Sequence, residues 1–264
     1  MAPASTNAFR IARTLSDIFP ANYLWTLLLH NVLLASLCWM LGIAVKRREW
    51  RVNYTRKINH FALMVIPFAI GPFLPYEPSW ITITTTLVVF LITTSLFAEP
   101  IRGRFSMVQT AFSSVDRPED RPHTLLWILT QAIAAYAVLV VLFLTFAKLD
   151  LHDFIIIPLL VNGIGDGLAE PIGVRFGRHR YRVPSLASGR HYTRSLEGSA
   201  CVVVMSIVTV MLLHQQMTLP QFALMMIVIP VGLTVAEAFS PHSWDSPFMY
   251  AVAGMLIVPI MVMV

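Results

Sequence analysis

Residues 23–48 read YLWTLLLHNVLLASLCWMLGIAVKRR, an apolar run that begins with aromatic side chains and ends with three basic ones. A helix needs about 20 apolar residues to cross the roughly 30 Å hydrocarbon core of a bilayer. Aromatic side chains at one end and basic side chains at the other are typical of anchoring at the two membrane–water interfaces. The run therefore predicts a membrane-spanning helix over 23–45.

Seven further apolar stretches follow, at 58–75, 79–98, 124–147, 152–171, 196–213, 219–238 and 247–264. Hydrophobic residues make up 56% of the 264-residue chain and charged residues 12%, against roughly 25% charged in an ordinary soluble domain. This composition excludes a solvated globular protein and a disordered chain. We expect an all-α, polytopic integral membrane protein with about eight transmembrane helices (seven to nine). It would have a polar tail at 1–22 and a single transmembrane catalytic domain at 23–264.

Basic residues predict the orientation of the spans. Sixteen of the 19 Lys and Arg residues lie in the loops after the first, third and fifth stretches. Cytoplasmic loops carry an excess of Lys and Arg, so these loops are predicted to face the cytoplasm. The same rule explains the net charge of +5, so the bilayer is an expected partner and nucleic acid is not. The location is predicted to be a bacterial inner membrane or an organelle membrane, with the catalytic face cytoplasmic.

A carboxylate recurs at the cytoplasmic end of three apolar stretches. Residues 98–105 read AEPIRGRF and residues 169–176 read AEPIGVRF, with six of the eight positions identical. The match predicts an internal repeat of two-helix units. Glu99 is expected to pair with a neighbouring Arg or to reach the interface. Glu170 and Glu237 are candidate functional residues, because a carboxylate at a helix end in lipid must face protein, water or a cation.

The densest polar cluster within an apolar stretch is NGIGDGLAEP at 162–171. Asp166 and Glu170 are four residues apart, so they share one side of a helix. Alternate glycines break regular packing and allow a ligand to approach the backbone, and irregular backbone in a membrane must line a cavity or be buried in protein. Two carboxylates followed by several Arg residues suit a polyphosphate that carries Mg²⁺.

Three other segments are predicted to lie on the same face. RKINH at 56–60 opens the second stretch, and RSLEG at 194–198 opens the sixth. Ser195 is a predicted helix N-cap, and the free N–H groups of a helix N-terminus are a natural phosphate site. The segment 237–247, EAFSPHSWDSP, has two carboxylates and no Lys or Arg. It is the one presumed cytoplasmic loop without positive charge, which indicates that it contributes metal ligands.

Together these motifs resemble the CTP-dependent polyprenol kinases, a family that includes dolichol, phytol and farnesol kinases and a yeast-type diacylglycerol kinase. The four motifs are RKxxH at 56–60, GDxxA at 165–169, RSLEG at 194–198 and EAxSPxxxD at 237–245. The chain departs from the family at two positions. The family usually has Lys where Arg194 stands, and Asn where Ser246 stands; Arg keeps the charge but changes the geometry of phosphate binding.

The resemblance implies transfer of the γ-phosphoryl group of a nucleoside triphosphate, CTP, to the hydroxyl of an isoprenoid or other lipid alcohol, with Mg²⁺ as cofactor. It implies that Asp166 is a Mg²⁺ ligand or the base toward the alcohol, and that Glu170 and His60 take part in catalysis. The implied metal ligands are Asp166, Glu237 and Asp245. The implied nucleotide and phosphate contacts are Arg56, Lys57, Asn162, Gly165, Arg194, Ser195, Glu197 and Gly198.

Two alternatives remain. The first is a CTP:phosphatidate cytidylyltransferase-like enzyme, although the carboxyl end is apolar over 248–264 and lacks the Lys-Asp and Asp-Arg pairs of those proteins. The second is a transporter or a non-catalytic membrane scaffold, since internal repeats and a broken helix beside a polar site also occur in carriers. The departures at Arg194 and Ser246 leave an inactive relative open as well.

Overall fold

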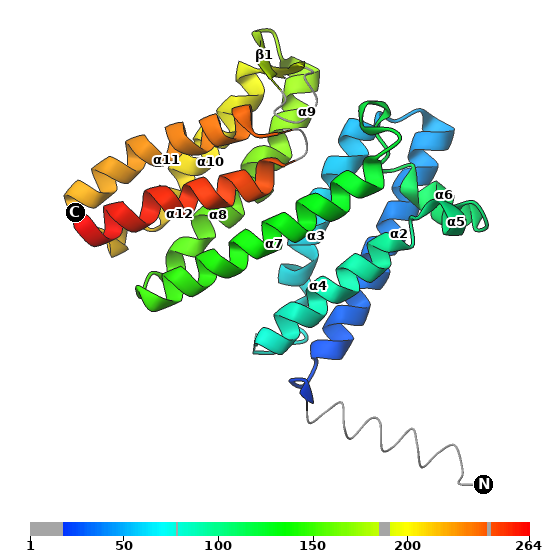
Figure 1. Ribbon diagram of the computed structural model, residues 1–264, viewed down its shortest axis with the longest axis horizontal. Helices are drawn as coiled ribbons and strands as arrows, with labels where there is room; N and C mark the ends of the chain where they lie inside the picture. The colour runs from blue at the N-terminus through cyan, green and yellow to red at the C-terminus, as the bar shows by residue number, and fades with distance from the viewer. Residues whose placement is uncertain (1–17, 78, 185–190, 242–243) are drawn as a thin grey trace, which may run out of the picture. The chain divides into compact units, whose positions relative to one another are not determined.

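The computed structural model describes residues 18–77, 79–184, 191–241 and 244–264 (Figure 1). Helices hold 79% of the chain, and the sheet among the described residues is one two-stranded ribbon. The predicted all-α class is therefore confirmed. The chain divides into two compact units, Met1–Asp116 (unit 1) and Arg117–Val264 (unit 2), and each is described by itself. Most of the predicted tail, residues 1–17, lies outside the described part.

Unit 1 contains helices α2 (Tyr23–Arg48), α3 (Val52–Ile70), α4 (Trp80–Ser95), α5 (Glu99–Arg102) and α6 (Ser106–Phe112). Helix α2 packs along α3 and α6. Helix α4 begins with a capping box in which the Ser79 hydroxyl accepts from the backbone N–H of Thr82 at 3.3 Å, which satisfies a donor that the helix leaves free. The buried Tyr23 hydroxyl donates to the Thr82 carbonyl oxygen at 2.8 Å. This bond joins the start of α2 to the start of α4.

Helix α6 lies so close to α2 that position 42 requires glycine. A Cβ atom on Gly42 would collide with the carbonyl oxygen of Thr110 on α6. We therefore expect Gly42→Ala to displace α6 and to destabilise unit 1 by about 1–3 kcal/mol, as overpacking does elsewhere, measured by unfolding in detergent. The control is Gly254→Ala, where the added atom meets only the end of the flexible Leu142 side chain. Equal losses at the two positions would contradict the prediction.

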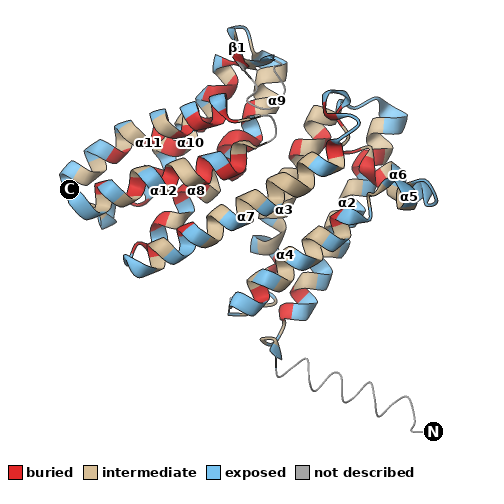
Figure 2. Cartoon of the chain, viewed as in Figure 1, coloured by how far each residue is buried: buried red, intermediate tan, exposed pale blue. Residues whose placement is uncertain are grey.

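Unit 2 contains most of the helical core. Its elements are η1 (Pro118–Asp120), α7 (Thr124–Lys148), η2 (His152–Ile155), α8 (Ile156–Leu160), η3 (Val161–Asp166), α9 (Gly167–Phe176), β1 (Arg180–Pro184), β2 (His191–Ser195), α10 (Leu196–Leu212), η4 (His214–Gln216), α11 (Leu219–Phe239) and α12 (Asp245–Met263). Helix α11 packs against α10 and α12, and α12 also packs against α7. The largest fully buried side chains of this core, red in Figure 2, include Ile157, Met225, Ile229, Leu233, Met249 and Ile257.

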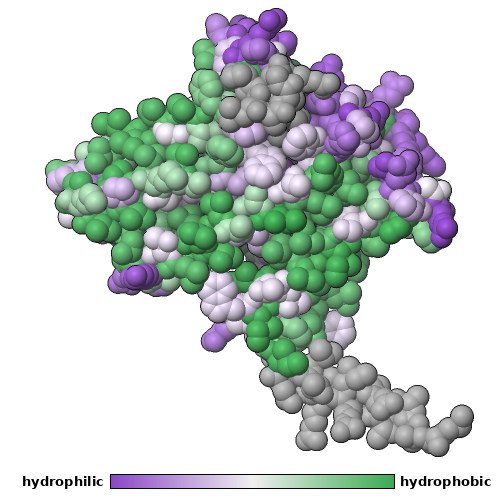
Figure 3. Space-filling model, in the orientation of Figure 1, coloured by the Kyte–Doolittle hydropathy of each residue, from purple (hydrophilic) through white to green (hydrophobic). Residues whose placement is uncertain are grey.

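The outer faces of these helices are apolar. Val141 on α7, Val231 on α11 and Met255 on α12 are 64%, 61% and 72% exposed. Large apolar patches are unusual on soluble monomers, whereas lipid tails are as apolar as these side chains. Figure 3 shows the apolar surface in green over the helices and hydrophilic residues in purple toward helix ends and connecting segments. The surface is that of a membrane protein.

Five helical segments among the described residues are long and apolar enough to span a membrane: α2, α7, the continuous run His152–Phe176, α11 and α12. Helices α4 and α10 cover two more predicted stretches but have only 16 and 17 residues. Helix α3 begins six residues before the predicted stretch 58–75, and its polar first half lowers its hydropathy. Membrane-spanning helices are thus supported, whereas the predicted number of eight is not confirmed.

The basic stretch after α9 was expected to be a loop and contains a β-hairpin. Strands β1 and β2 pair antiparallel, with Arg180 opposite Ser195 and Val183 opposite Tyr192. Arg180, Tyr181, Arg182 and Val183 alternate basic and apolar residues, and successive side chains of a strand point to opposite faces. Val183 is accordingly buried and Arg182 exposed. This period of two was the sequence signal for a strand.

The two AEPI segments fold differently. In the first, α4 has already ended at Ser95, and Glu99 begins the separate short helix α5. In the second, Glu170 lies inside α9, which continues to Phe176 and is followed by the hairpin. The predicted repeat of two-helix units is therefore not confirmed.

Candidate functional site

The glycine-rich segment forms a π-helical turn, η3, inside the run His152–Phe176. Asn162 and Asp166 on this turn are only 3% and 4% exposed. The backbone irregularity expected from the glycines is thus present, and π-turns are frequent at functional sites. A Cβ atom on Gly165 would lie 3.2 Å from both Val202 and Met205 of α10. Gly165, predicted to contact nucleotide, therefore serves to pack α10 against η3.

Four polar side chains, Asn162, Asp166, Asp245 and Tyr250, form what we call the carboxylate cluster. The Asn162 amide donates to the buried Tyr250 hydroxyl at 2.8 Å. The carboxyl groups of Asp166 and Asp245 both lie close enough to Tyr250 to act on it electrostatically. Asp166 ends η3 and Asp245 begins α12, so the helix pair brings together two predicted site residues that are 79 positions apart.

Gln131 of α7 fixes the first turn of α12. Its side-chain nitrogen donates to Asp245 Oδ1 at 3.3 Å and to Ser246 Oγ at 3.2 Å. The Ser246 backbone N–H also donates to Asp245 Oδ1, at 3.1 Å. Ser246, which stands where the family has Asn, is therefore a buried hydrogen-bond acceptor in this chain. Sequence reasoning missed Gln131, whose only signal is that it is an amide within an apolar stretch.

Arg194 at the end of β2 forms an ion pair with Glu237 near the end of α11. The Glu237 side chain is 3% exposed and the Arg194 side chain 23% exposed. Glu237 Oε2 is buried and has no hydrogen-bond partner among the described residues. A buried carboxylate is stable only when a cation or hydrogen bonds compensate it. Arg194 supplies that compensation, and the second oxygen can still accept a bond.

Glu170, predicted to be catalytic, is held by Arg117. Arg117 is 7% exposed, and its guanidinium donates to Asp120 at 2.8 and 3.2 Å and to Glu170 Oε1 at 3.0 Å. Glu99 was expected either to pair with a neighbouring Arg or to reach the interface. Glu99 is exposed, and the guanidinium of its neighbour Arg102 lies over the Phe112 ring, 4.4 Å from the centroid.

Removal of Arg117 is expected to destabilise unit 2. Arg117→Gln leaves Asp120 and Glu170 without the guanidinium that bridges them, and breaking a buried pair costs about 3–5 kcal/mol. The measurement is unfolding of the full chain in detergent. Arg178→Gln, which removes an exposed charge, is the control and should stay within about 0.5 kcal/mol of the parent. A comparable loss in both variants would contradict the assignment.

The first turn of α10 is built as predicted for a capped helix. The Ser195 hydroxyl accepts from the Gly198 N–H at 3.1 Å, and a Cβ on Gly198 would meet the Ala169 carbonyl oxygen. Glu197 Oε1 accepts from the backbone N–H groups of Arg178 and His179 at 3.0 and 3.1 Å. In this structure Ser195 caps α10, Gly198 lets α9 pack against it, and Glu197 anchors the start of the hairpin; their contact with phosphate stays a prediction.

The remaining predicted site residues, Arg56, Lys57 and His60, lie on α3 in unit 1. Lys57 is 5% exposed. Helix α3 is tied to the segment after α6, because the Asn59 amide donates to Ser114 Oγ at 2.9 Å. The participation of these three side chains in phosphate binding stays a prediction.

No three His, Cys, Asp or Glu side chains among the described residues are placed to hold one metal ion. Mg²⁺ differs from structural metals, however, because it is usually held by one or two carboxylates together with waters and substrate phosphates. Glu237 Oε2, which has no hydrogen-bond partner among the described residues, and the carboxyl groups of Asp166 and Asp245 are oxygen ligands of that type. These residues fit an ion delivered with a nucleotide and do not form a complete metal cage.

Comparisons with protein-family models, with curated proteins and with solved structures found no match. The family resemblance therefore depends on the four motifs, and the candidate site on the contacts described above.

Proposed function

We propose that this chain is a membrane lipid kinase. It transfers the γ-phosphoryl group of a nucleoside triphosphate, with CTP as the donor, to the hydroxyl of an isoprenoid or other lipid alcohol at the cytoplasmic face. Support comes from the order of the four motifs and from ionisable residues gathered within an apolar helical bundle.

The observation that carries the proposal is the burial of Glu237 with Arg194 in the same unit as the carboxylate cluster. Ionisable residues within membrane helices are costly, and such residues mark functional sites. Here the participating groups come from four separate elements, η3, β2, α11 and α12, spread over residues 161–263. The helices could be anchored in the bilayer without burying any of these ionisable side chains.

The proposed reaction is an in-line displacement. The hydroxyl oxygen of the lipid alcohol attacks the γ-phosphorus, the bond from that phosphorus to the β,γ-bridging oxygen breaks, and CDP leaves with the bonding electrons. In this proposal Asp166 either accepts the hydroxyl proton or binds Mg²⁺, and in the second case the proton passes to water or to a phosphate oxygen. Mg²⁺, when bound, neutralises charge between the phosphate oxygens. Arg194 can donate hydrogen bonds to a phosphate from the exposed part of its side chain.

The test is transfer of label to lipid. The purified full chain in detergent is incubated with Mg²⁺, with γ-labelled CTP or ATP, and with phytol, farnesol, a long polyprenol or diacylglycerol in separate reactions. We expect one alcohol to acquire the label, with CDP as the co-product. Release of pyrophosphate would instead indicate a cytidylyltransferase. Label in neither product, with flux of a solute across proteoliposomes, would indicate a carrier.

A further inference from the structure

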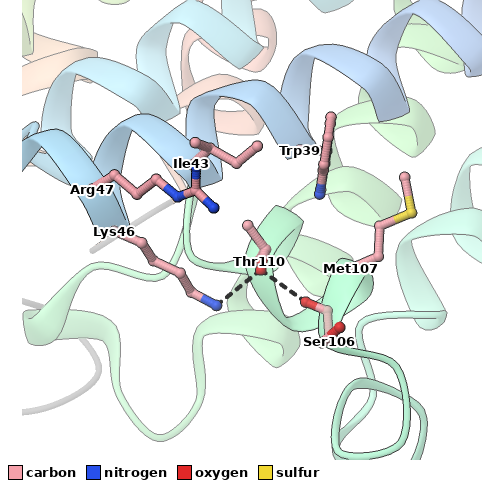
Figure 4. A pocket seen from close by; sticks show the side chains of 7 residues that line it. All are labelled: Trp39, Ile43, Lys46, Arg47, Ser106, Met107 and Thr110. Carbon is pink, nitrogen blue, oxygen red and sulfur yellow. Dashed lines mark hydrogen bonds between the residues drawn. The ribbon is translucent and has the colours of Figure 1, made fainter.

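A pocket of about 400 Å³ lies in unit 1 between the basic end of α2 and helix α6 (Figure 4). Four of its lining residues come from α2 and three from α6. They are Trp39, Ile43, Lys46, Arg47, Ser106, Met107 and Thr110. The lining therefore combines two cations with apolar side chains and contains no carboxylate.

The basic side chains of the pocket are available to an anion. Lys46 is held in place, because its Nζ donates to Thr110 Oγ1 at 2.9 Å and Thr110 in turn donates to the Ser106 carbonyl oxygen at 2.8 Å. Arg47 points its guanidinium toward the pocket in Figure 4 and has no ion pair with any described residue. An ammonium group and a guanidinium on one wall suit a phosphate group.

Two of the apolar lining residues, Trp39 and Ile43, precede the cations along α2. Trp39 precedes Lys46 by seven residues, which is about 10 Å along a helix. Helix α2 is one of the five segments able to span a membrane, and its last turn carries three basic residues. If α2 spans the bilayer with its basic end at the interface, Lys46 and Arg47 would lie at the level of the lipid headgroups, and Trp39 and Ile43 would lie toward the hydrocarbon.

We propose that this pocket binds the headgroup of an anionic phospholipid from the cytoplasmic leaflet. Basic pockets beside transmembrane helices on the cytoplasmic side bind acidic headgroups. The volume is near the lower end of the range for small-molecule sites, roughly 300–1,000 Å³, which suits a headgroup whose chains remain in the bilayer. None of the residues that line this pocket is among those assigned to phosphoryl transfer.

The test uses the full chain in detergent with phosphatidylglycerol or phosphatidylcholine, and native mass spectrometry counts the retained lipids. The pocket variant is Lys46→Gln with Arg47→Gln. Its matched control is Arg48→Gln with Arg51→Gln, which removes the same charge from the same segment without touching the pocket. Two cations in contact with an anionic headgroup predict a loss of about 30-fold in phosphatidylglycerol affinity. The control should stay near the parent, because Arg48 and Arg51 do not line the pocket.

The proposal is supported if the parent prefers phosphatidylglycerol and only the pocket variant loses that preference, with both variants keeping the melting temperature of the parent. It is overturned if phosphatidylcholine binds equally well or if both variants lose affinity alike, since that is general surface charge. Competition by inorganic phosphate at concentrations comparable to the lipid would also overturn it, because the site would then recognise a free anion. If the pocket variant fails to fold, Trp39→Ala tests the apolar side in the same assay, with loss supporting the proposal and retention opposing it.

Discussion

Replacing Asp166 with asparagine is expected to lower the rate of phosphoryl transfer by about 10²–10⁴-fold, the usual contribution of a positioned acid–base group. Asparagine keeps the volume of the buried side chain but carries no negative charge, so it neither accepts the hydroxyl proton nor neutralises Mg²⁺. The measurement is the initial rate of labelled lipid formation by the full chain in detergent with γ-labelled CTP.

The matched control for this variant is Asp153→Asn. Asp153 lies at the start of the same helical run and accepts a hydrogen bond from Gln216 at 2.8 Å in an exposed position. Its activity should stay near that of the parent. A Mg²⁺ titration separates the two roles of Asp166: a ligand role raises the Mg²⁺ requirement of the variant, and a base role lowers the rate at saturating Mg²⁺. Near-normal activity of Asp166→Asn would remove the central residue from the proposal.

The positions of several long helices could be predicted because hydrophobicity reports directly on lipid contact. The stretch 124–147 became α7, Thr124–Lys148, and 219–238 became α11, Leu219–Phe239. Helix α3 shows that hydrophobicity does not predict where a helix begins. It begins at Val52, although Asn53, Arg56 and Asn59 are polar, because the backbone can be helical wherever neighbouring protein or the interface satisfies such side chains. An apolar run therefore predicts which residues lie in the hydrocarbon core of the bilayer, but it does not predict the first and last residues of the helix.

The partners of the candidate site residues could be predicted only in part. The motif order predicts one site for Asp166, Asp245, Arg194 and Glu237. The structure pairs Arg194 with Glu237 and places Asp166 and Asp245 within electrostatic range of Tyr250. That the two sets form one site stays a prediction. The sequence indicates only that Arg117 belongs to a basic loop. Its partner Glu170 is 53 residues away in sequence, and the number of basic residues in a loop does not show which side chains are close in the folded protein. Tyr250 was read as part of an apolar stretch for the same reason.

Arg194→Gln is expected to destabilise unit 2 by about 3 kcal/mol, the lower end of the cost of breaking a buried ion pair. The change leaves the Glu237 carboxylate buried without a cation. Glu237→Gln should cost less, about 1–2 kcal/mol, because Arg194 is 23% exposed and can turn to water. Reversible unfolding of the full chain in detergent measures both, with Arg182→Gln on the exposed side of the same hairpin as the control for lost charge.

The double variant Arg194→Met with Glu237→Leu separates a structural pair from a functional one. Replacing both charges with apolar groups of similar volume is often neutral or stabilising, so the double variant should recover most of the stability that Arg194→Gln loses. If the pair only holds β2 against α11, kinase activity should recover with stability. The proposed function requires the opposite result, a stable protein without phosphoryl transfer, because the charged groups of Arg194 and Glu237 would both have been removed from the proposed nucleotide site.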